Sequence, residues 1–449
     1  MPNRGDHLAS LRAKDYDVLI LGGGINGAGV ARDLALRANT TGTPLRIALI
    51  EKNHFASGTS GKNSQLIHGG LRYLKYFEFH LVREALRERA TLIRIAPHLV
   101  APQPFLIPLY EPFAKAFYGA GLTLYDALAG SRNVARHRAI SAAELHRMEP
   151  AMEPRRLRGA QLFFDCQVNS ARLVLDNIFD AARLGATVVN YVEAVDVSPT
   201  LVRARDTLTG DRFEINARQV VDSTGAWAAS DSLRLVRGSH LILPRLNHSD
   251  NAIAHFDPQG RVVFLIPWGS RRQLTLVGTT DVDHNASPDQ VQISAEETEY
   301  LTNVVRRLYP NADTTPISTY SSLRPLIKTS APSATSTSRE HRIWRAESGI
   351  VHIAGGKYTT YRSMSEEATD LVCRDLFPAL TGQCTTATTV ISGRPDLPSP
   401  AEAAQYEMAQ TAHDYLYVST YLGYESRTIP DALAQQLEEI FPAKQSAPR

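Results

Sequence analysis

Three glycines near the N-terminus have the spacing of a turn that binds dinucleotides. Gly22, Gly24 and Gly27 follow the pattern G-x-G-x-x-G in DVLILGGGINGAGVARDL, and Glu51 follows at the distance of a ribose-binding acid. The first glycine permits a tight turn, the second lets the backbone approach a pyrophosphate, and the third lets helix and strand pack closely. Glu51 is placed to accept hydrogen bonds from a ribose 2′-hydroxyl and would repel a 2′-phosphate. The pattern therefore predicts a site for NAD or FAD and disfavours NADP.

Two strands and a helix must position these residues. The apolar run Val18–Leu21 is typical of a buried parallel strand, and Leu45–Lys52 (LRIALIEK) indicates a second one. Between them, the composition of Ala28–Ala38 favours a helix, whose N-terminus would offer free N–H groups and the positive end of its dipole to the phosphates. This order of elements predicts a dinucleotide site rather than a glycine-rich turn without a ligand.

The sequence after the second strand distinguishes FAD from NAD. Residues 52–74, KNHFASGTSGKNSQLIHGGLRYL, form a long polar stretch whose hydroxyl groups and glycines can wrap a bulky cofactor. An NAD domain would continue with another regular strand. Two later strands, in Val220–Trp227 and Val351–Met364, end in glycine turns that could return to the same sheet, although each could be a structural turn alone. We therefore expect FAD, held by a domain that is discontinuous in sequence.

Composition fits an ordinary globular protein of two or three domains. The chain has 449 residues, of which 43% are hydrophobic and 21% charged, with a formal net charge of +2. This balance, without a Lys/Arg tract, gives no indication of nucleic-acid binding. Cys166, Cys373 and Cys384 are widely spaced and form no CxxC pair, so we expect reduced thiols and no metal site.

Two segments bear on membrane contact. The N-terminal residues lack the apolar core of a secretory signal and indicate a polar tail. No run of 18 apolar residues occurs, so no spanning helix is expected. The segment Phe113–Arg138 combines aromatic residues and leucines with a basic end, which fits either a peripheral membrane helix or a helix that packs into the core.

A series of motifs in fixed order resembles one enzyme family. LGGGINGAGVARDLALRA, SQLIHGGLRYL, STGAW, RGSHLILPR, IPWG, VGTTDVD, SSLRPL and GGKYTTYR follow one another between residues 21 and 362. Together they closely resemble FAD-dependent glycerol-3-phosphate dehydrogenase. The resemblance implies oxidation of sn-glycerol 3-phosphate to dihydroxyacetone phosphate, with hydride transfer to FAD and electrons passed on to a quinone.

The resemblance also implies an α/β fold with three parts. These are a Rossmann-like FAD-binding domain, an antiparallel β-sheet substrate domain like that of D-amino-acid oxidase, and a short helical C-terminal cap. Period-2 runs such as RVVFLIPW and QLTLVGTTDVD support the substrate domain. The expected boundaries are 1–15 for a polar tail, 16–100, 160–230 and 340–385 for the FAD domain, 101–159 for a helical insertion, 231–339 for the substrate domain and 390–449 for a reduced cap.

Carried over by motif, the resemblance assigns site residues from all of these parts. The expected FAD contacts are Gly22, Gly24, Gly27, Glu51, Thr59, Ser60, Ser64, Leu66, His68, Gly69, Ala194, Thr224, Gly225 and Gly356. The expected substrate-binding residues are Arg72, Tyr73, Arg324, Lys357 and Thr359, with His240 facing the same cavity. Whether FAD is covalently attached is left open.

The substrate-binding set has the chemistry that a phosphorylated polyol requires. The planar fork of arginine binds phosphate oxygens in pairs, and lysine adds a point charge. For the oxidation itself, His240 has a suitable ordinary pKa for a base. Arg324 could orient the C2 oxygen and stabilise alkoxide charge, and Lys357 could do either. The sequence does not choose among these three catalytic candidates.

The resemblance further implies a cytoplasmic protein that lies peripherally on the inner face of the cell membrane, and it leaves a homodimer open. Two other functions are kept as alternatives. One is a related flavin oxidase that uses oxygen or acts on another small hydroxy or amino substrate. The other is a flavin-containing binding protein without turnover.

Four features depart from the family pattern. Ala38 stands where glycine is usual, Gln65 replaces the lysine that usually precedes LIHGG, and Ser365 replaces an alanine. After ISGRPDLPSP the remaining chain is much shorter than the usual cap, which leaves membrane attachment, dimer contacts and closure over the substrate in question.

Overall fold

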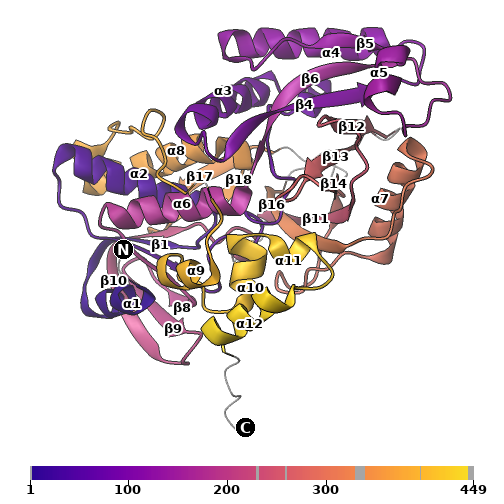
Figure 1. Ribbon diagram of the computed structural model, residues 1–449. Helices are drawn as coiled ribbons and strands as arrows, with labels where there is room; N and C mark the ends of the chain where they lie inside the picture. The colour runs from indigo at the N-terminus through magenta and orange to yellow at the C-terminus, as the bar shows by residue number, and fades with distance from the viewer. Residues whose placement is uncertain (1–2, 229–231, 258–259, 329–338, 395, 443–449) are drawn as a thin grey trace.

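The computed structural model describes residues 3–228, 232–257, 260–328, 339–394 and 396–442, in which two sheets are flanked by helices (Figure 1). The first sheet has eight strands, and its five central strands run parallel. In spatial order these strands are β17 (His341–Arg345), β18 (Val351–Gly355), β10 (Arg212–Asp222), β1 (Tyr16–Leu21), β2 (Ile47–Glu51) and β7 (Thr187–Asn190), with β9 (Leu201–Asp206) and β8 (Val192–Val197) extending from β10.

Both faces of this first sheet are covered. Three helices, α2 (Ile25–Thr41), α6 (Ser170–Arg183) and α8 (Tyr361–Leu376), lie on one face, and Val18 and Ile20 belong to the core beneath them. Leu19 and Leu21 belong to a second core with β8, β9 and the N-terminal helix α1 (Arg4–Ala13). Because successive side chains of a strand point to opposite faces, the apolar run of β1 is buried on both sides.

The glycine turn joins β1 to α2 as the spacing predicts. Gly24 is the N-cap of α2, and the helix extends the predicted Ala28–Ala38 at both ends. A Cβ at Gly27 would lie 2.0 Å from the carbonyl oxygen of Gly22, so only glycine lets α2 approach the turn this closely. The helix N-terminus therefore sits directly at the carboxyl end of β1.

The second sheet has ten strands, paired antiparallel except that β12 and β4 run parallel. Helix α7 (Ala295–Leu308) packs on one face through Leu301 and Val305. The main path is β15 (Val282–Asp283), β11 (Leu233–Pro244), β14 (Leu274–Gly278), β13 (Val262–Trp268), β12 (Ala252–Phe256), β4 (Val100–Pro108), β6 (Gly159–Val168) and β3 (Leu66–Ile67), with β16 (Ser318–Ile327) on β11 and β5 (Arg138–Ser141) on β6. The two sheets confirm the predicted α/β fold class.

The prediction of a polar tail at residues 1–15 is wrong, because residues 4–13 form helix α1. Asn3 and Asp6 form a capping box at its start, and Leu11 is fully buried beneath the first sheet. The guanidinium of Arg4 donates to Asp206 at 3.1 Å, which fixes the helix to β9. One apolar residue per turn was too weak a periodic signal to predict this helix. Residues 1–2 lie outside the described part of the chain.

The expected helical insertion at 101–159 is also corrected. Its first residues form β4, which pairs along its whole length with β6 in the second sheet. The rest comprises α4 (Ala114–Ala129), β5, and α5 (Ala142–Met148). Prolines in VAPQPFLIP suggested an irregular segment, yet the strand accommodates them, and Phe105, Leu106 and Ile107 are buried. Since β6 belongs to the second sheet too, the FAD domain resumes only with α6.

The C-terminal segment forms short helices that pack on the loop after β2. Tyr421 donates its hydroxyl to the carbonyl of Gly61 at 2.6 Å and accepts from the N–H of Ala171 at 3.1 Å. The elements are α9 (Pro400–Tyr406), α10 (Ala412–Asp414), a π-helical turn over Tyr415–Ser419, α11 (Leu422–Glu425) and α12 (Asp431–Ile440). The expected cap residues 395 and 443–449 lie outside the described part.

Candidate active site

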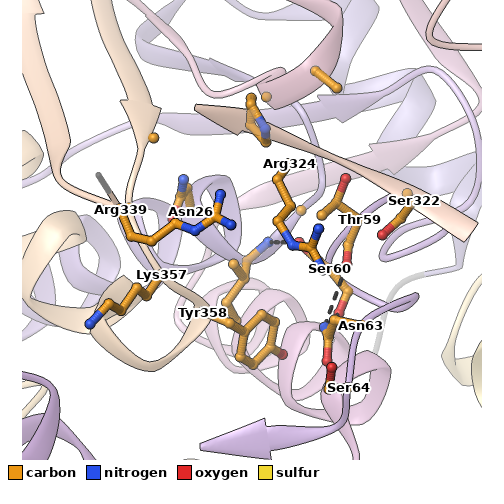
Figure 2. Close-up of a pocket in the computed structure, with 18 of the residues that line it drawn as sticks. Asn26, Thr59, Ser60, Asn63, Ser64, Ser322, Arg324, Arg339, Lys357 and Tyr358 are labelled. Atoms are coloured by element: carbon orange, nitrogen blue, oxygen red, sulfur yellow. Dashed lines mark hydrogen bonds between the residues drawn. The ribbon is translucent and has the colours of Figure 1, made fainter. Parts of the chain in front are cut away.

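A cavity of about 540 Å³ lies between the two sheets. Its walls come from the carboxyl ends of β1, β2, β10 and β18, from the loop after β2, and from strands of the second sheet. Figure 2 shows side chains from several of these elements around it, among them Thr59, Ser60 and Arg324. A cleft at the carboxyl ends of parallel strands is where open α/β sheets place their ligands.

One end of the cavity is built from the glycine turn and Glu51. The Glu51 carboxylate accepts from the N–H of Gly23 at 2.7 Å and from that of Asn53 at 2.9 Å. Burial raises the pKa of Glu51, which these two donors oppose. The hydroxyl of Ser60 accepts from the N–H of Ile25 at 2.9 Å and so closes the turn from the loop side. The acid therefore lies beside the N-terminus of α2, as the motif predicts.

The residues of this cavity fit FAD. The first turn of α2 supplies N–H groups without partners inside the helix, which suits a pyrophosphate. A Cβ at Gly225 would meet no atom nearer than 4.0 Å, so this backbone lies open toward the cavity that it lines. Ala194 of β8 also lines the cavity, beyond Glu51. These features leave room for an extended dinucleotide from the glycine turn to the second sheet.

Most of the residues expected to bind FAD or substrate line this one cavity, and Gly27, Gly69 and Thr359 do not. Gly27 packs on the turn, whereas the N–H of Gly69 donates to the hydroxyl of Tyr125 at 2.9 Å. The hydroxyl of Thr359 accepts from the N–H of His68 at 3.1 Å. The residues that line it are Gly22, Gly24, Glu51, Thr59, Ser60, Ser64, Leu66, His68, Arg72, Tyr73, Ala194, Thr224, Gly225, His240, Arg324, Gly356 and Lys357.

Three arginines converge on one carboxylate in the wall of the cavity. Asp281 accepts from Arg324 at 2.9 Å, from Arg339 at 3.2 Å and from Arg72 at 3.3 Å. Although burial alone would raise it, Arg324, Arg339 and Arg72 together hold the pKa of Asp281 below its usual range. Three guanidinium charges face one carboxylate charge, so this wall carries an excess of positive charge.

A fourth cation lies beside this cluster. The ammonium of Lys357 is 3.9 Å from the ring centre of Tyr73, and it is buried without a hydrogen-bond partner among the described residues. Burial lowers the pKa of Lys357. The guanidinium of Arg72 lies 5.4 Å from the same ring, so Tyr73 joins Lys357 to the arginine cluster. An unpaired buried ammonium at a cavity wall favours an anionic ligand.

His240 on β11 faces the loop after β2. Its Nε2 atom lies 2.9 Å from the hydroxyl of Ser64, and its ring lies 4.9 Å from that of Tyr320. Its Nδ1 atom is buried without a hydrogen-bond partner in the described part of the chain. Burial, and secondarily the charge of Arg324, lowers the pKa of His240 to about 3. The ring is therefore neutral at physiological pH.

Known proteins are similar to this chain over most of its length. The family model for FAD dependent oxidoreductases matches residues 17–362. The glycerol-3-phosphate dehydrogenase of Synechocystis sp. is 36% identical over 426 residues, covering 87% of this chain and 75% of that protein. The aerobic glycerol-3-phosphate dehydrogenase of Staphylococcus haemolyticus is 33% identical over 410 residues, covering 86% and 72%. This chain belongs to the family of FAD-dependent glycerol-3-phosphate dehydrogenases.

Other comparisons extend the family assignment. The human mitochondrial glycerol-3-phosphate dehydrogenase is 34% identical over 406 residues, but the chain spans only 54% of its length. The structure of the glycerol-3-phosphate dehydrogenase from Bacillus halodurans complexed with FAD aligns with a TM-score of 0.75 and 23% identity, covering 97% and 91% of the two chains. Glycine oxidase from Geobacillus kaustophilus aligns with a TM-score of 0.61 and 22% identity, covering 82% and 99%. These structures have the same fold, and the chain is a flavoprotein with FAD as its cofactor.

Motif transfer from the glycerol-3-phosphate dehydrogenase family left three residues of the site unassigned. Asp281 lies in the quoted motif VGTTDVD, and Gly238 lies in RGSHLILPR, so the family motifs contained both. Arg339, which Figure 2 labels near Lys357 and Arg324, lies in no motif, and only the fold brings it to Asp281. A search of the motifs for acids that could pair with the predicted cations could have indicated Asp281. No sequence signal indicates Arg339.

Gly238 has a structural role that is specific to Arg324. A Cβ at Gly238 would lie 2.3 Å from the nearest guanidinium nitrogen of Arg324, because the arginine crosses the neighbouring strand at this point. We expect Gly238→Ala to retain FAD and fold but to lower kcat/KM for the substrate by about tenfold or more, as a displaced guanidinium loses its alignment. Steady-state kinetics and flavin content measure this.

Gly121→Ala is the matched control for Gly238→Ala. A Cβ at Gly121 would meet no atom within 4 Å, so its kinetics should equal those of the wild type. Unchanged kinetics of Gly238→Ala would contradict the inferred role.

Of the departures from the dehydrogenase pattern, Gln65 has the clearest structural account. Its side-chain oxygen accepts from the N–H and the hydroxyl of Ser170, at 2.9 and 3.0 Å. Its amide nitrogen donates to the carbonyl of Gly61 at 3.2 Å. Gln65 therefore ties the loop after β2 to the start of α6 by neutral hydrogen bonds. Nothing in the structure explains Ala38 or Ser365.

Proposed function

We propose that this chain oxidises sn-glycerol 3-phosphate to dihydroxyacetone phosphate and passes the electrons to a quinone. The observation that supports this most directly is a group of four cations in the same cavity as the glycine turn, three of them on the Asp281 carboxylate and the fourth over the ring of Tyr73. The four are Arg72, Arg324, Arg339 and Lys357. Its excess charge suits a phosphate near two negative charges, and the family membership supplies the substrate.

The cationic residues divide the work of substrate binding. Arg72, Arg339 and Lys357 would hold the phosphate, since guanidinium groups bind its oxygens in pairs and the unpaired ammonium adds a point charge. Arg324 also donates to the hydroxyl of Thr279 at 2.8 Å and to the carbonyl of Thr280 at 3.0 Å. These bonds fix its orientation, so that its remaining donors could stabilise negative charge on the C2 oxygen. Thr359 would act indirectly, through the backbone of His68.

The proton of the C2 hydroxyl needs an acceptor, and we assign this role to His240. Its ring is neutral and so has a lone pair available, and the hydroxyl of Ser64 contacts one nitrogen. The charge of a bound phosphate would oppose that of Arg324 and so raise the pKa of His240, while burial, the larger cause of its lowering, would persist. When bound, FAD supplies the hydride acceptor, and the glycine turn, Glu51 and the loop after β2 would hold it.

The lowered pKa of Tyr73 predicts that substrate binding depends on pH. Burial alone would raise its pKa, but Lys357, Arg72 and Arg339 lower the pKa of Tyr73 to about 8. Above this pH the phenol becomes an anion beside the phosphate site, so KM for glycerol 3-phosphate should rise about tenfold between about pH 7 and pH 9. Steady-state KM across this range measures the effect.

Tyr73→Phe has no phenol to ionise, so its KM should stay level over the same range. An equal rise in Tyr73→Phe would attribute the effect to deprotonation of Lys357 and contradict the role given to Tyr73.

Anaerobic mixing of the purified flavoprotein with glycerol 3-phosphate tests the proposed function. We expect the yellow flavin absorbance to bleach with glycerol 3-phosphate and not with glycerol, which lacks the phosphate. Reoxidation by a quinone analogue supports the proposed acceptor. Peroxide formation in air without a quinone would instead favour an oxidase, and no bleaching would favour a binding protein without turnover.

A quinone acceptor also bears on location. Quinones with long apolar tails reside in membranes, so a cytoplasmic protein that uses one must reach the inner face of the cell membrane. Among the described residues, no helix combines the length and apolar character needed to cross a bilayer. We propose peripheral contact, and a homodimer remains a prediction.

A further inference from the structure

A buried carboxylate lies behind the wall of the cavity that carries the cations. Glu297, in the first turn of α7, is only 4% exposed, whereas Glu296 and Glu299 of the same helix are exposed. Burying a carboxylate costs free energy unless hydrogen bonds compensate the loss of water. Glu297 does not line the cavity, so the proposed function as described above gives this buried acid no part.

The carboxylate of Glu297 is surrounded by donors from β11, from the turn after β14 and from the N-cap of α7. Its Oε1 atom accepts from the hydroxyl of Ser239 at 2.9 Å and from that of Thr280 at 2.5 Å. Its Oε2 atom accepts from the guanidinium of Arg237 at 2.9 Å and from the N–H of Ser294 at 3.0 Å. Both oxygens therefore act as acceptors, which an amide in their place could not do.

The segments beside Glu297 present alternate residues to it and to the cavity. On β11, Ser239 faces Glu297 and the next residue lines the cavity. After β14, Thr280 faces Glu297, whereas Thr279 and Asp281 line the cavity. Because successive side chains of an extended chain point to opposite faces, Glu297 binds the back of the same segments whose front carries the site.

Thr280 connects this carboxylate to Arg324. Its hydroxyl donates to Glu297 and accepts from a backbone N–H of β11 at 2.9 Å, which fixes the orientation of the side chain. Its carbonyl accepts from Arg324 at 3.0 Å on the cavity side. The neighbours Thr279 and Asp281 also accept from Arg324, at 2.8 and 2.9 Å. The segment that Glu297 holds from behind therefore carries three acceptors that orient this guanidinium.

We infer that Glu297 is a positioning residue for the proposed reaction. It holds the segment from Thr279 to Asp281 against the back of the sheet and so sets the orientation of Arg324 at the C2 oxygen of the substrate. This inference rests on the proposed function, because Arg324 acts there on glycerol 3-phosphate. Glu297 also completes the capping box of α7 with Ser294, but capping requires neither its bond to Thr280 nor its bonds to β11.

Glu297→Gln tests this role, because the side chain keeps its size and offers one acceptor oxygen in place of two. Arg237 and the N–H of Ser294 can only donate, so they would take the amide oxygen, and the amide NH₂ group would face Thr280. The Thr280 hydroxyl then loses its acceptor. We expect kcat/KM for glycerol 3-phosphate to fall about tenfold, mainly through kcat, with flavin content unchanged. Glu299→Gln, on the exposed side of the helix, should match wild type.

Variants of Thr280 test the same link without altering Glu297. Thr280→Val keeps the shape and removes the hydroxyl, so it should lower kcat/KM about as much as Glu297→Gln. Thr280→Ser keeps the hydroxyl and should restore wild-type kinetics. Ser294→Ala separates helix capping from positioning, since the hydroxyl of Ser294 accepts from the N–H of Glu297 at 3.2 Å. It should lower the unfolding temperature and leave kcat/KM unchanged.

A double-mutant cycle distinguishes positioning from a purely structural role. If Glu297 acts through Arg324, Glu297→Gln should lower kcat/KM by less than about twofold in an Arg324→Ala background. The full loss in that background would overturn the inference, as would wild-type kinetics of Glu297→Gln or of Thr280→Val. Should Glu297→Gln fail to fold, Thr280→Val takes its place in the cycle.

Flavin bleaching of the wild type by glycerol 3-phosphate separates this inference from the proposed function. If no bleaching occurs, the proposed function fails, and calorimetric binding of inorganic phosphate decides the role of Glu297. Asp281 also holds Arg72 and Arg339, so displacing its segment should disturb the whole cationic wall. Glu297→Gln should then bind phosphate at least about threefold more weakly than wild type, and equal binding would overturn the inference.

Discussion

Replacing Arg324 with alanine is expected to lower kcat/KM for glycerol 3-phosphate by about 10³-fold while FAD remains bound. Arg324 is held by Thr279, Thr280 and Asp281 in the cavity wall, and none of these partners belongs to the glycine turn. The variant therefore removes an oriented guanidinium from the substrate side and leaves the cofactor side intact. Steady-state kinetics with a quinone analogue, together with flavin content, measure the effect.

Two further variants make the Arg324 result specific. Arg324→Lys keeps the charge but loses the fork, so we expect a smaller loss, between that of alanine and wild type. Arg271→Ala removes an exposed arginine from the turn between β13 and β14 and should leave the kinetics unchanged. Near-normal turnover of Arg324→Ala would remove Arg324 from the site and, with it, the proposed stabilisation of charge at the C2 oxygen.

Replacing Lys357 with methionine is expected to raise KM for glycerol 3-phosphate by about 10- to 100-fold. Methionine retains an unbranched apolar stem over the ring of Tyr73 and removes only the ammonium. Because this ammonium is buried and has no hydrogen-bond partner among the described residues, a bound phosphate would be its first strong partner. Its loss should weaken substrate binding more than it disturbs the fold.

The Lys357 variant carries a second signature. Lys357 is the strongest of the charges that lower the pKa of Tyr73, so its removal should move the alkaline rise of KM to higher pH. The exposed Lys14 provides the control, since Lys14→Met should change neither KM nor its pH dependence. If Lys357→Met left KM unchanged, the ammonium would have no part in binding the substrate phosphate.

Local pattern determined the cofactor half of the site. The strand before Gly22, the helix after Gly24 and the strand ending at Glu51 follow from short-range periodicity and from glycine stereochemistry, and the structure has all three. The ordered motifs likewise predicted that Arg72, Arg324 and Lys357 lie together, and the three residues line one cavity. These inferences succeed because each rests on residues within a few turns of one another, or on a motif whose context is local.

Other parts of the fold depended on distant partners. Residues 4–13 form a helix because Leu11 packs against the first sheet and Arg4 bonds to Asp206 of β9 in that sheet. Their own sequence is not strongly periodic. The run Val100–Pro108 is a strand because β6 pairs with it from about sixty residues away. Secondary-structure propensity is a weak guide where tertiary contacts outweigh it. In isolation the first segment was predicted as a polar tail and the second as part of a helical insertion.

The sequence by itself indicated that the chain binds a dinucleotide and that this is FAD, and its motifs predicted that Arg72, Arg324 and Lys357 line one cavity. Only the tertiary structure decided that Asp281 joins three arginines, that Arg339 is one of them, and that Gly238 makes room for Arg324. It also decided that Glu297 lies behind the segments that carry the site. The reason is physical: a charge pair or a buried acid depends on which residues meet in space, and this chain brings them together from strands and loops that no local pattern connects.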